Sequence, residues 1–476
     1  MSPKRSAVSS DSDAKVSEPD RTASSLRDPF GFLTEKKDGT LIRHVGPRLA
    51  DASRRFLESD FYTSLTESRR LVEHRDVGVE FAGANGAVVL EPRRIPVVTY
   101  PYEWPFSLLK KAALLTLDIQ IEAVDAGFTL RDGTAFNVLF EGVRPIFIDF
   151  GSFDVRAEGQ PWVGYKQFCE HFLAPLALSA RFKRPPNLFN SVGMDGYPLD
   201  AASSMMPVRS WLNWGLLWHL HLHGRSIRKS SIDGGRNLRV KAVSIRALKG
   251  LLTSLRSTVQ SLKYPIEKGD WATYYSDNSY SDRAMSHKEE LVDTWLAAGG
   301  KCELILDLGG NAGRFSAIAS KYADNVVLVD SDHDSVELAA REFEQRGVTN
   351  IYTAVLDLTD PSAGRGWAGR ERPGFRSRVK PQKALALALI HHLVISAGIP
   401  MERVAAHFRE ISPCLIIEFV PPGDPMVDLL SANKSGQHHD YTRAGFEQAF
   451  SDHFSLKTRQ ELADSGRVLY EFTDQG

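Results

Sequence analysis

The residues best placed to do chemistry are two aspartates, each of which closes a short apolar run. Asp307 follows the run at 304–306, and Asp330 follows the run at 326–329. Apolar runs of this kind are typical of buried parallel strands. Three glycines and then apolar residues at helical spacing come after the first aspartate; the glycines are Gly309, Gly310 and Gly313. A strand, a glycine turn and a helix in this order predict the phosphate- or nucleoside-binding start of a doubly wound α/β domain.

The spacing of the glycines in this turn distinguishes a dinucleotide site from sites for other nucleoside ligands. A dinucleotide site has the pattern G-x-G-x-x-G, whereas the turn from Asp307 to Gly313 reads D-x-G-x-N-x-G. It resembles motif I of class I S-adenosylmethionine-dependent methyltransferases, with Asn311 where many members have a glycine. The resemblance implies S-adenosylmethionine as the cofactor. Its contacts at the first two strand ends would be Asp307, Gly309, Gly310, Asn311, Gly313, Asp330 and Ser331. A Rossmann-like turn that binds NAD or no ligand is the alternative.

A third strand, predicted at 350–358, leads into an unusually long loop at 359–378. In the methyltransferases that the chain resembles, an acidic residue at this strand end lies near the adenine amino group. The resemblance therefore implies Asp357 and Leu358 as cofactor contacts. Loops of this length are often functional, although a solvated basic loop is the alternative. Three of its side chains are candidates for contacts with adenine or with an anionic substrate group: Trp367, Arg370 and Arg372.

The fourth predicted strand, at 384–390, runs into His391 and His392. Ligands of open α/β sheets bind beyond the carboxyl ends of the strands, so both histidines should lie beside the transferred methyl group. A histidine with a pKa near 6.5 removes a proton from a hydroxyl nucleophile at neutral pH, which makes either one a candidate base. The alternative is that they hold only backbone or cofactor. Glu418 ends the fifth strand and is a candidate for orienting a histidine or binding a polar substrate, with structural capping as its alternative.

Two further patterns concern the acceptor. The segment I-H-H-L after the fourth strand resembles that of small-molecule methyltransferases, and the N-P-P-[YF] pattern of enzymes that methylate amide or base nitrogens is absent from the sequence. The stretches DLTDPSAGRGW, LALALIHHLVIS and IIEFVPPGD, together with YPYEWPF nearer the N-terminus, resemble a bacterial group of methyltransferases, some of whose members are labelled nodulation proteins. We therefore expect a small-molecule or glycan-type acceptor, methylated at a hydroxyl, and no nucleic-acid partner.

A second informative stretch lies at 130–154. Asp132 precedes Asn137 by five residues, and an apolar strand leads to Asp149 in a D-F-G sequence. This resembles the catalytic and metal-binding loops of kinases. The resemblance implies that Asp132 orients a hydroxyl while Asn137 and Asp149 hold magnesium. Because the sequence shows neither a glycine-rich phosphate loop nor a V-A-I-K-type lysine, we expect a degenerate lobe that serves as a scaffold or substrate platform. Chance turn chemistry is the other interpretation.

Composition and length bound the remaining possibilities. The 476 residues predict two or three domains, and the formal net charge of -1 gives no overall attraction to nucleic acid. The three cysteines lie far apart, which argues against a disulfide framework and a zinc site, so we expect no metal and a cytoplasmic location. No apolar run approaches the roughly 20 residues of a membrane span, and no membrane partner is expected.

Composition also suggests the domain boundaries. The expected parts are a disordered tail at 1–25, an N-terminal α+β domain at 26–225 that is possibly kinase-like, a basic connector with a bridging helix at 226–265, and a class I methyltransferase domain at 266–476 with a seven-stranded Rossmann-like sheet. Candidates for the rim of the cofactor site are Tyr274, Tyr280 and Lys288. Aromatic residues at helical spacing in the N-terminal domain are expected to form core: Trp211, Trp214 and Trp218.

We therefore expect an S-adenosylmethionine-dependent methyltransferase. Two other hypotheses stay open: a bifunctional protein that combines a kinase-like phosphotransferase with a methyltransferase, and a non-catalytic module that binds the cofactor as a sensor. The sequence does not predict the oligomeric state.

Overall fold

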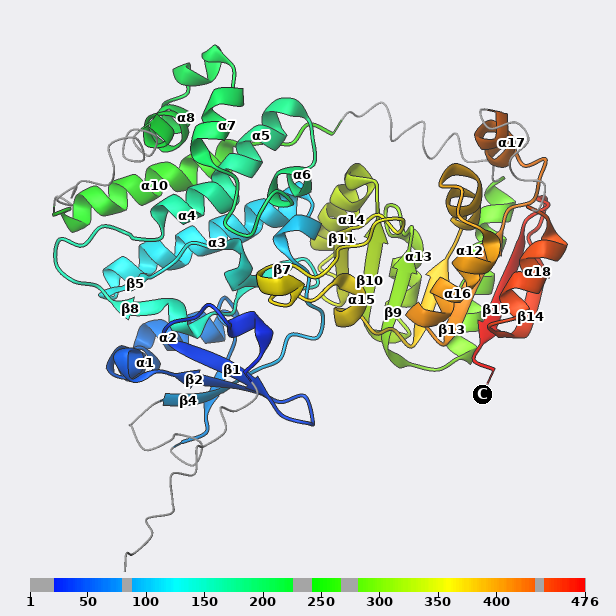
Figure 1. The fold of residues 1–476 in the computed structure, drawn as a ribbon, viewed down its shortest axis with the longest axis horizontal. Helices are drawn as coiled ribbons and strands as arrows, with labels where there is room; N and C mark the ends of the chain where they lie inside the picture. Colours follow the sequence, from blue (N-terminus) through cyan, green and yellow to red (C-terminus); the bar gives the residue numbers. More distant parts are fainter. Residues whose placement is uncertain (1–20, 79–87, 226–241, 267–280, 433–440, 476) are drawn as a thin grey trace, which may run out of the picture.

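The computed structural model describes residues 21–78, 88–225, 242–266, 281–432 and 441–475. Two units lie side by side (Figure 1). The N-terminal unit ends with helix α10 (Ile245–Ser261), and the C-terminal unit begins with helix α12 (Asp282–Ala298). Among the described residues, no helix combines the length and the apolar composition that crossing a bilayer requires.

A seven-stranded sheet organises the C-terminal unit, with the order β11-β10-β9-β12-β13-β15-β14. The pairs among β9 to β13 are parallel, and β15 is antiparallel to both of its neighbours. The strands are β9 (Cys302–Leu308), β10 (Ala323–Asp330), β11 (Ile351–Val355), β12 (Lys383–Ala386), β13 (Cys414–Phe419), β14 (Ser455–Glu461) and β15 (Val468–Thr473). The predicted Rossmann-like doubly wound sheet, closed by an antiparallel hairpin, is thus confirmed.

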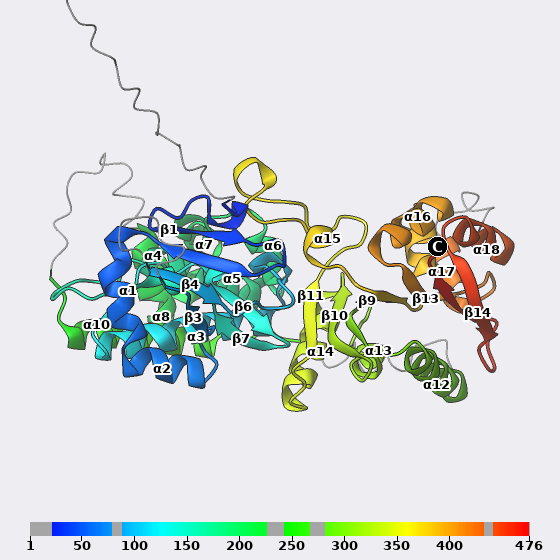
Figure 2. The same ribbon diagram turned by 90° about the horizontal axis from the view of Figure 1, so that it is seen from below.

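Successive side chains of the central strands enter two different cores, as alternation along a strand requires. Ile305 and Val326 lie in one core, whereas Leu306 and Val327 lie in the other. Helices α12, α13 and α14 cover the first face of the sheet, and α15, α16 and α18 cover the second (Figure 2). The helices after α12 are α13 (Arg314–Ala319), α14 (His333–Gln345), α15 (Phe375–Arg378), α16 (Met401–Ile411), α17 (Pro425–Ala432) and α18 (Arg443–Ser451).

The N-terminal unit begins with a four-stranded antiparallel sheet in the order β1-β2-β4-β3. Two short hairpin-like pairs follow the long helix α3 (Phe106–Asp125): β5 with β8, and β6 with β7. The strands are β1 (Gly31–Glu35), β2 (Leu41–Val45), β3 (His74–Asp76), β4 (Val88–Pro92), β5 (Phe128–Leu130), β6 (Val138–Glu141), β7 (Arg144–Phe147) and β8 (Phe153–Val155). The kinase-like candidates lie around these two small pairs.

Helices make up most of the rest of this unit. They are α1 (Ala50–Leu57), α2 (Asp60–Glu67), α4 (Tyr165–Phe168), α5 (Ala174–Phe182), α6 (Pro186–Asn190), α7 (Leu199–Met205) and α8 (Trp214–Leu216). Helix α10, which we expected to bridge the two domains, instead packs along α3, where Lys249 pairs with Asp125 at 2.7 Å. Residues 21–25, expected to belong to the tail, lie against the first sheet, since Arg21 pairs with Thr34 across a β-bridge.

The first turn of α3 joins the two units. Its N-cap residue, Pro105, offers no side-chain acceptor for the free amides of the turn. Instead, the buried carboxylate of Glu337 on α14 accepts a hydrogen bond from Ser107 N at 2.7 Å, and His333 Nε2 accepts one from Phe106 N at 3.2 Å. Amides at a helix N-terminus favour a negative partner. The C-terminal unit therefore supplies the cap that α3 lacks.

The long loop after β11 makes a second connection. It extends over the N-terminal unit, as Figure 2 shows in yellow. Three of its arginines lie over aromatic rings there, with the guanidinium carbon 4.4 Å (Arg365 and Tyr102), 4.9 Å (Arg372 and Phe136) and 4.3 Å (Arg378 and Tyr100) from the ring centroid. These cation–π contacts attach the loop to the N-terminal unit.

A buried ion pair anchors the end of this loop. Arg378 pairs with Glu103, and the two side chains are only 5% and 0% exposed. Glu103 also accepts a hydrogen bond from Tyr100 N at 2.8 Å. Both charges are therefore satisfied only while the two units stay together.

We predict that Glu103→Gln will destabilise the protein by about 3–5 kcal/mol, because it leaves the buried Arg378 guanidinium without a counter-charge. Chemical denaturation measures this free energy. The matched control is Glu91→Gln, whose partner Arg75 is 71% exposed, and its effect should stay within about 1 kcal/mol. Equal losses in the two variants would contradict the prediction.

Candidate cofactor-binding site

The turn after β9 brings bare main chain to the end of the strand. Gly309 and Asn311 both have positive φ, at 68° and 48°. Asparagine tolerates this conformation better than most residues, and Asn311 Oδ1 accepts a hydrogen bond from Ala312 N at 2.7 Å. A Cβ atom on Gly310 would lie 2.8 Å from Leu328 Cγ and 2.9 Å from Asp307 Oδ2. The turn thus requires glycine at 310 and accommodates asparagine at 311.

Asp330 at the end of β10 connects two turns. Its Oδ2 accepts a hydrogen bond from Asn311 N at 2.9 Å, and its Oδ1 accepts one from Asp332 N at 2.9 Å. Burial raises the pKa of this carboxyl, while the two amides act in the opposite direction. Each carboxylate oxygen has a second lone-pair direction, so the group still has the capacity to accept hydrogen bonds from a ligand.

Asp307 lies deeper, at the end of β9. It is 2% exposed, and its Oδ2 accepts a hydrogen bond from Ser316 Oγ at 2.6 Å. Burial raises its pKa to about 6. Its side chain fixes the start of α13 relative to β9 and contributes negative charge to the floor of the site.

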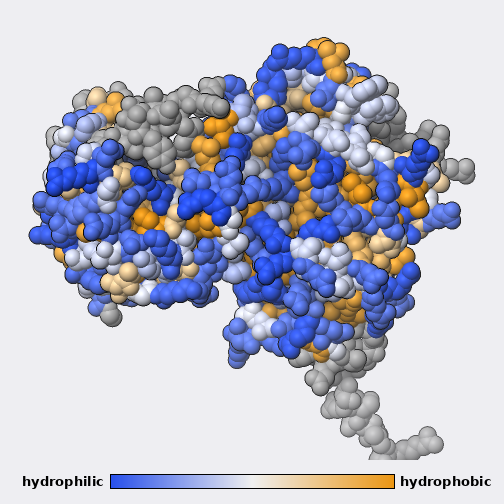
Figure 3. All heavy atoms as spheres, turned by 180° about the vertical axis from the view of Figure 1, so that it is seen from behind, coloured by the Kyte–Doolittle hydropathy of each residue, from blue (hydrophilic) through white to orange (hydrophobic). Residues whose placement is uncertain are grey.

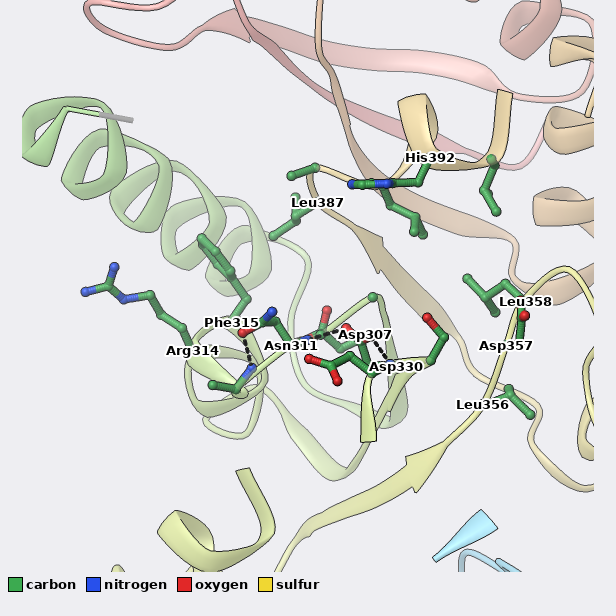
Figure 4. Close-up of a pocket in the computed structure, with 18 of the residues that line it drawn as sticks. Asp307, Asn311, Arg314, Phe315, Asp330, Leu356, Asp357, Leu358, Leu387 and His392 are labelled. Atoms are coloured by element: carbon green, nitrogen blue, oxygen red, sulfur yellow. Dashed lines mark hydrogen bonds between the residues drawn. The ribbon is translucent and has the colours of Figure 1, made fainter. Parts of the chain in front are cut away.

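These strand ends surround a cavity of about 580 Å³ (Figure 4). A volume of this size suits a small-molecule or nucleoside ligand. Eight of the nine predicted cofactor contacts line the cavity: Asp307, Gly309, Gly310, Asn311, Asp330, Ser331, Asp357 and Leu358. Residues separated by 50 positions in the sequence are thus brought to one edge of the sheet.

Gly313 is the predicted contact that does not line the cavity. It precedes α13 with φ at 85°, and a Cβ atom there would lie 2.4 Å from Phe343 Cζ on α14. The glycine therefore allows close packing of two helices. Trp367, Arg370 and Arg372 are also absent from the lining: Trp367 is 76% exposed, and the arginine-bearing loop contacts the N-terminal unit as described above.

The two predicted histidines have different positions. His392 lines the cavity from the segment after β12 (Figure 4), and desolvation lowers its pKa below the ordinary histidine value. His391 is 2% exposed and lies behind it, with ring centroids 4.3 Å apart. Burial lowers the pKa of His391 to about 3, so this ring is neutral across the physiological range. Only His392 is positioned to meet a ligand.

Glu418 lies under the cavity wall and does not line it. The carboxylate is fully buried; Oε2 is 2.6 Å from Lys288 Nζ and accepts a hydrogen bond from Ala388 N at 2.9 Å. Oε1 lies 3.5 Å from Arg467 Nη1. Ala388 lines the cavity with φ at 51°, a conformation that alanine rarely adopts. Glu418 therefore holds the strained segment after β12 in place.

Lys288 is the rim candidate that the structure describes at the cavity, and it is 2% exposed. Burial lowers its pKa, although the Glu418 carboxylate opposes that effect. Tyr274 and Tyr280 lie outside the described residues. The sequence analysis missed several lining residues whose types carry no signal of their own: Met285, Arg314, Phe315, Leu387, Ala388 and Ser396.

The structure also brings the three kinase-like candidates together. Asp132 Oδ1 accepts hydrogen bonds from Asn137 Nδ2 at 2.6 Å and from Ser152 Oγ at 2.8 Å. Burial and the nearby Asp149 charge raise the pKa of Asp132 to about 6. Arg43 on β2, which the sequence analysis missed, lies 3.5 Å from Asp149 Oδ1.

Arg43 packs against this cluster. Its Nη2 is 2.5 Å from Asp28 Oδ2, and a Cβ atom on Gly151 would lie 2.2 Å from the same nitrogen. The guanidinium therefore packs directly on the D-F-G turn. Within the described ranges, no group of three or more His, Cys, Asp or Glu side chains is arranged to hold a metal ion.

Comparison with known proteins identifies relatives over most of the chain. No protein-family model matches. The chain is 33% identical over 472 residues to the nodulation protein NoeA of Rhizobium meliloti (strain 1021). The match covers 96% of this chain and 97% of that protein. A shorter match, 25% identical over 116 residues and covering 24% of this chain and 26% of the relative, is to the 23S rRNA (uracil(1939)-C(5))-methyltransferase RlmD of Methylococcus capsulatus.

Two solved structures are similar to this chain over less than half of its length. The N-methyltransferase NodS from Bradyrhizobium japonicum WM9 matches with a TM-score of 0.31 and 11% identity, covering 41% of this chain and 99% of that one. Magnesium protoporphyrin IX methyltransferase from Synechocystis PCC 6803, determined with bound S-adenosylhomocysteine, matches with a TM-score of 0.31 and 18% identity, covering 43% and 92%.

The sheet order, the glycine turn and the two strand-end aspartates are those of a methyltransferase that uses S-adenosylmethionine. The cavity fits that cofactor, because the main chain at Gly310 lines it and the Asp330 carboxylate retains acceptor capacity. The match to the nodulation protein NoeA, at 33% identity, extends over both units of this chain. The chain belongs to the family of the nodulation protein NoeA, and its C-terminal unit is an S-adenosylmethionine-dependent methyltransferase.

Proposed function

We propose that the chain methylates a hydroxyl group of a small-molecule or glycan-type acceptor. The observation that carries this proposal is the position of His392, whose ring lines the cavity on the side of the segment after β12. The same cavity holds Asp307 and Asp330 at the ends of β9 and β10, so the two ends of one site differ in chemistry. One end suits a nucleoside, and the other offers a proton acceptor.

We assign the cofactor-binding roles by position. When bound, S-adenosylmethionine supplies an activated methyl group on a sulfonium. Asp330 would accept hydrogen bonds from the ribose hydroxyls, and Asp357 with Leu358 would meet the base. The main chain at Gly309 and Gly310 would lie along the methionine portion, since no side chain separates it from the cavity.

His392 would act as the general base. A histidine whose pKa is lowered is unprotonated at neutral pH, so it can take the proton of a hydroxyl nucleophile as the new bond forms. His391 is neutral and buried behind it. That ring limits the positions available to His392 and keeps water from its inner side.

Lys288 and Glu418 would position the acceptor side of the cavity. Their buried ion pair supports Ala388, and Lys288 Nζ also lies 4.8 Å from the ring centroid of Phe315, a second lining residue. Transfer to an activated methyl group depends mainly on alignment and on exclusion of water. A wall held by a buried ion pair serves both requirements.

Other acceptors and activities have less support. The formal net charge of -1 gives no general affinity for nucleic acid. A kinase-like phosphotransferase would need Asp149 for magnesium, but Arg43 lies against that carboxylate. A sensor that only binds the cofactor would not need a histidine base beside the cavity.

Labelling with S-adenosylmethionine that carries an isotopic methyl group tests the acceptor class. The purified protein is incubated with hydroxyl-bearing oligosaccharides, with RNA and with protein substrates, and S-adenosylhomocysteine and label are measured. We expect label in an oligosaccharide hydroxyl. Transfer to RNA or protein instead would contradict the proposed acceptor, and binding of the cofactor without turnover on any of them would support the sensor hypothesis.

Asp330→Ala should weaken binding of S-adenosylhomocysteine by at least about 100-fold, because hydrogen bonds to a charged group are worth about 1.5–3 kcal/mol each and two are lost. Isothermal titration calorimetry measures the affinity. Asp324→Ala is the matched control, since Asp324 lies at the other end of the same strand and pairs with the exposed Lys301. Unchanged affinity in Asp330→Ala would show that this carboxylate does not hold the ribose.

His392→Asn should lower kcat by about 10²–10⁴-fold with the labelled acceptor, the usual contribution of a general base. In the unsubstituted protein, kcat/KM should fall only at acidic pH, where a histidine of lowered pKa becomes protonated, and this limb should be absent from the variant. His407→Asn on α16 is the control, because His407 is not among the cavity-lining residues. A wild-type pH profile in His392→Asn would argue against the base role.

A further inference from the structure

An apolar surface at one end of the N-terminal unit has no role in the site described above. We define the α7–α8 tip as the exposed side chains of Met205, Val208, Leu212, Trp214 and Trp218. Val208 and Leu212 are 86% and 89% exposed, and the two tryptophans are 72% and 55% exposed. The sequence predicted that tryptophans at this spacing form core, and for this pair the structure shows the opposite. Their exposure needs another explanation.

The tip projects from the unit. The helices α7 and α8 and the turns between them form the uppermost part of the N-terminal unit in Figure 1, and Figure 3 shows apolar atoms gathered at the end of this projection. Trp214 and Trp218 stack on each other with ring centroids 6.2 Å apart. The surface therefore projects from the unit and includes a stacked pair of indoles.

The fold supports this surface from below. His221 lies under the tip and forms hydrogen bonds with Ser203 Oγ and Ser210 Oγ, both at 2.8 Å. Its ring stacks on that of Trp211, with 4.3 Å between the ring centroids. Both ring nitrogens of His221 thus have partners within the unit. The exposed apolar side chains are held in place by packed structure and do not belong to a frayed end.

Two arginines lie within or beside the residues of the tip, and α7 also carries the exposed Asp200. Arg209 lies between Val208 and Leu212 in the 3-10 turn η8 (Val208–Leu212), and Arg225 lies over the ring of Trp211 at 4.2 Å. In the sequence, no acidic residue occurs between Asp200 and Asp233. Aliphatic side chains insert into the acyl boundary of a bilayer, indoles favour the headgroup level, and arginines are attracted to anionic headgroups. The tip has all three features.

A protein partner fits this surface less well. A projecting tip with a few exposed aliphatic side chains offers little area, whereas interfaces between copies of a chain bury about 800 Å² on each side. A bilayer interface is fluid and adapts to a small projection. Arg209 and Arg225 also complement anionic lipid.

We propose that the α7–α8 tip binds the surface of an anionic phospholipid bilayer as a peripheral contact. The chain then lies on the membrane through Val208 and Leu212, with Trp214 and Trp218 at the headgroup level. This contact does not depend on the proposed acceptor chemistry. It would hold the protein at a membrane surface.

Flotation of the full-length protein with phosphatidylcholine vesicles, with and without phosphatidylglycerol, tests the proposal. We expect stronger binding to the anionic vesicles, weakened by salt. Val208→Asp/Leu212→Asp should lower the partition coefficient at least about tenfold, because the energy of burying two aliphatic side chains is lost. Both positions are highly exposed, so the variant should fold and bind S-adenosylhomocysteine with unchanged affinity.

The matched control is Leu188→Asp/Val192→Asp, which alters two other exposed aliphatic side chains of the same unit, at 56% and 66% exposure. It should bind vesicles like the unsubstituted protein. Three results would overturn the proposal: equal binding to neutral and anionic vesicles, unchanged binding of the Val208→Asp/Leu212→Asp variant, or self-association without lipid that this variant abolishes. The last result would assign the tip to contact between copies of the chain.

Discussion

Asp330 accepts one hydrogen bond from Asn311 in the turn after β9 and another from Asp332 in the turn after β10. Two adjacent turns are thus fixed to one carboxylate, and the geometry of the cofactor cavity depends on it. The neighbouring Asp307 performs a related task one strand away, because it binds Ser316 on α13. Among the described residues neither carboxylate forms an ion pair; main-chain amides and a hydroxyl donate hydrogen bonds to them. A ligand can therefore add hydrogen bonds without first breaking an ion pair.

The contacts between the two units give polar and charged groups a partner that their own unit does not supply. Helix α3 begins after a proline that cannot cap it, and Glu337 from the other unit accepts its amide. The long loop between β11 and β12 starts at Asp357, which lines the cavity, and ends at Arg378, which pairs with Glu103 across the boundary. The side of the cavity that Asp357 lines is thus continuous, through one short stretch of chain, with the surface of the N-terminal unit. Through this connection, the position of the N-terminal unit constrains the cavity.

The sequence predicted those features that local patterns determine. Apolar runs ending in aspartate located β9 and β10, and the glycine spacing located the turn between strand and helix. Contacts that depend on distant partners were not predictable: Glu418 meets Lys288 across 130 positions, and no pattern indicates that Ala388 has positive φ. The exposed tryptophans show a further limit, because helical spacing reports which residues share a face and does not report whether anything covers it.

The charges that line the cavity suggest how a ligand and its product are distinguished. Two cations line it, and both are engaged: Lys288 with Glu418, and Arg314 with Glu289 at 2.7 Å. The lining aspartates, by contrast, form no ion pair with lysine or arginine in the part of the chain that the structure describes: Asp307, Asp330, Asp332 and Asp357. The lining therefore favours a positively charged ligand. A sulfonium carries such a charge before transfer, and the thioether left afterwards does not, so the same carboxylates would hold the donor more strongly than the product.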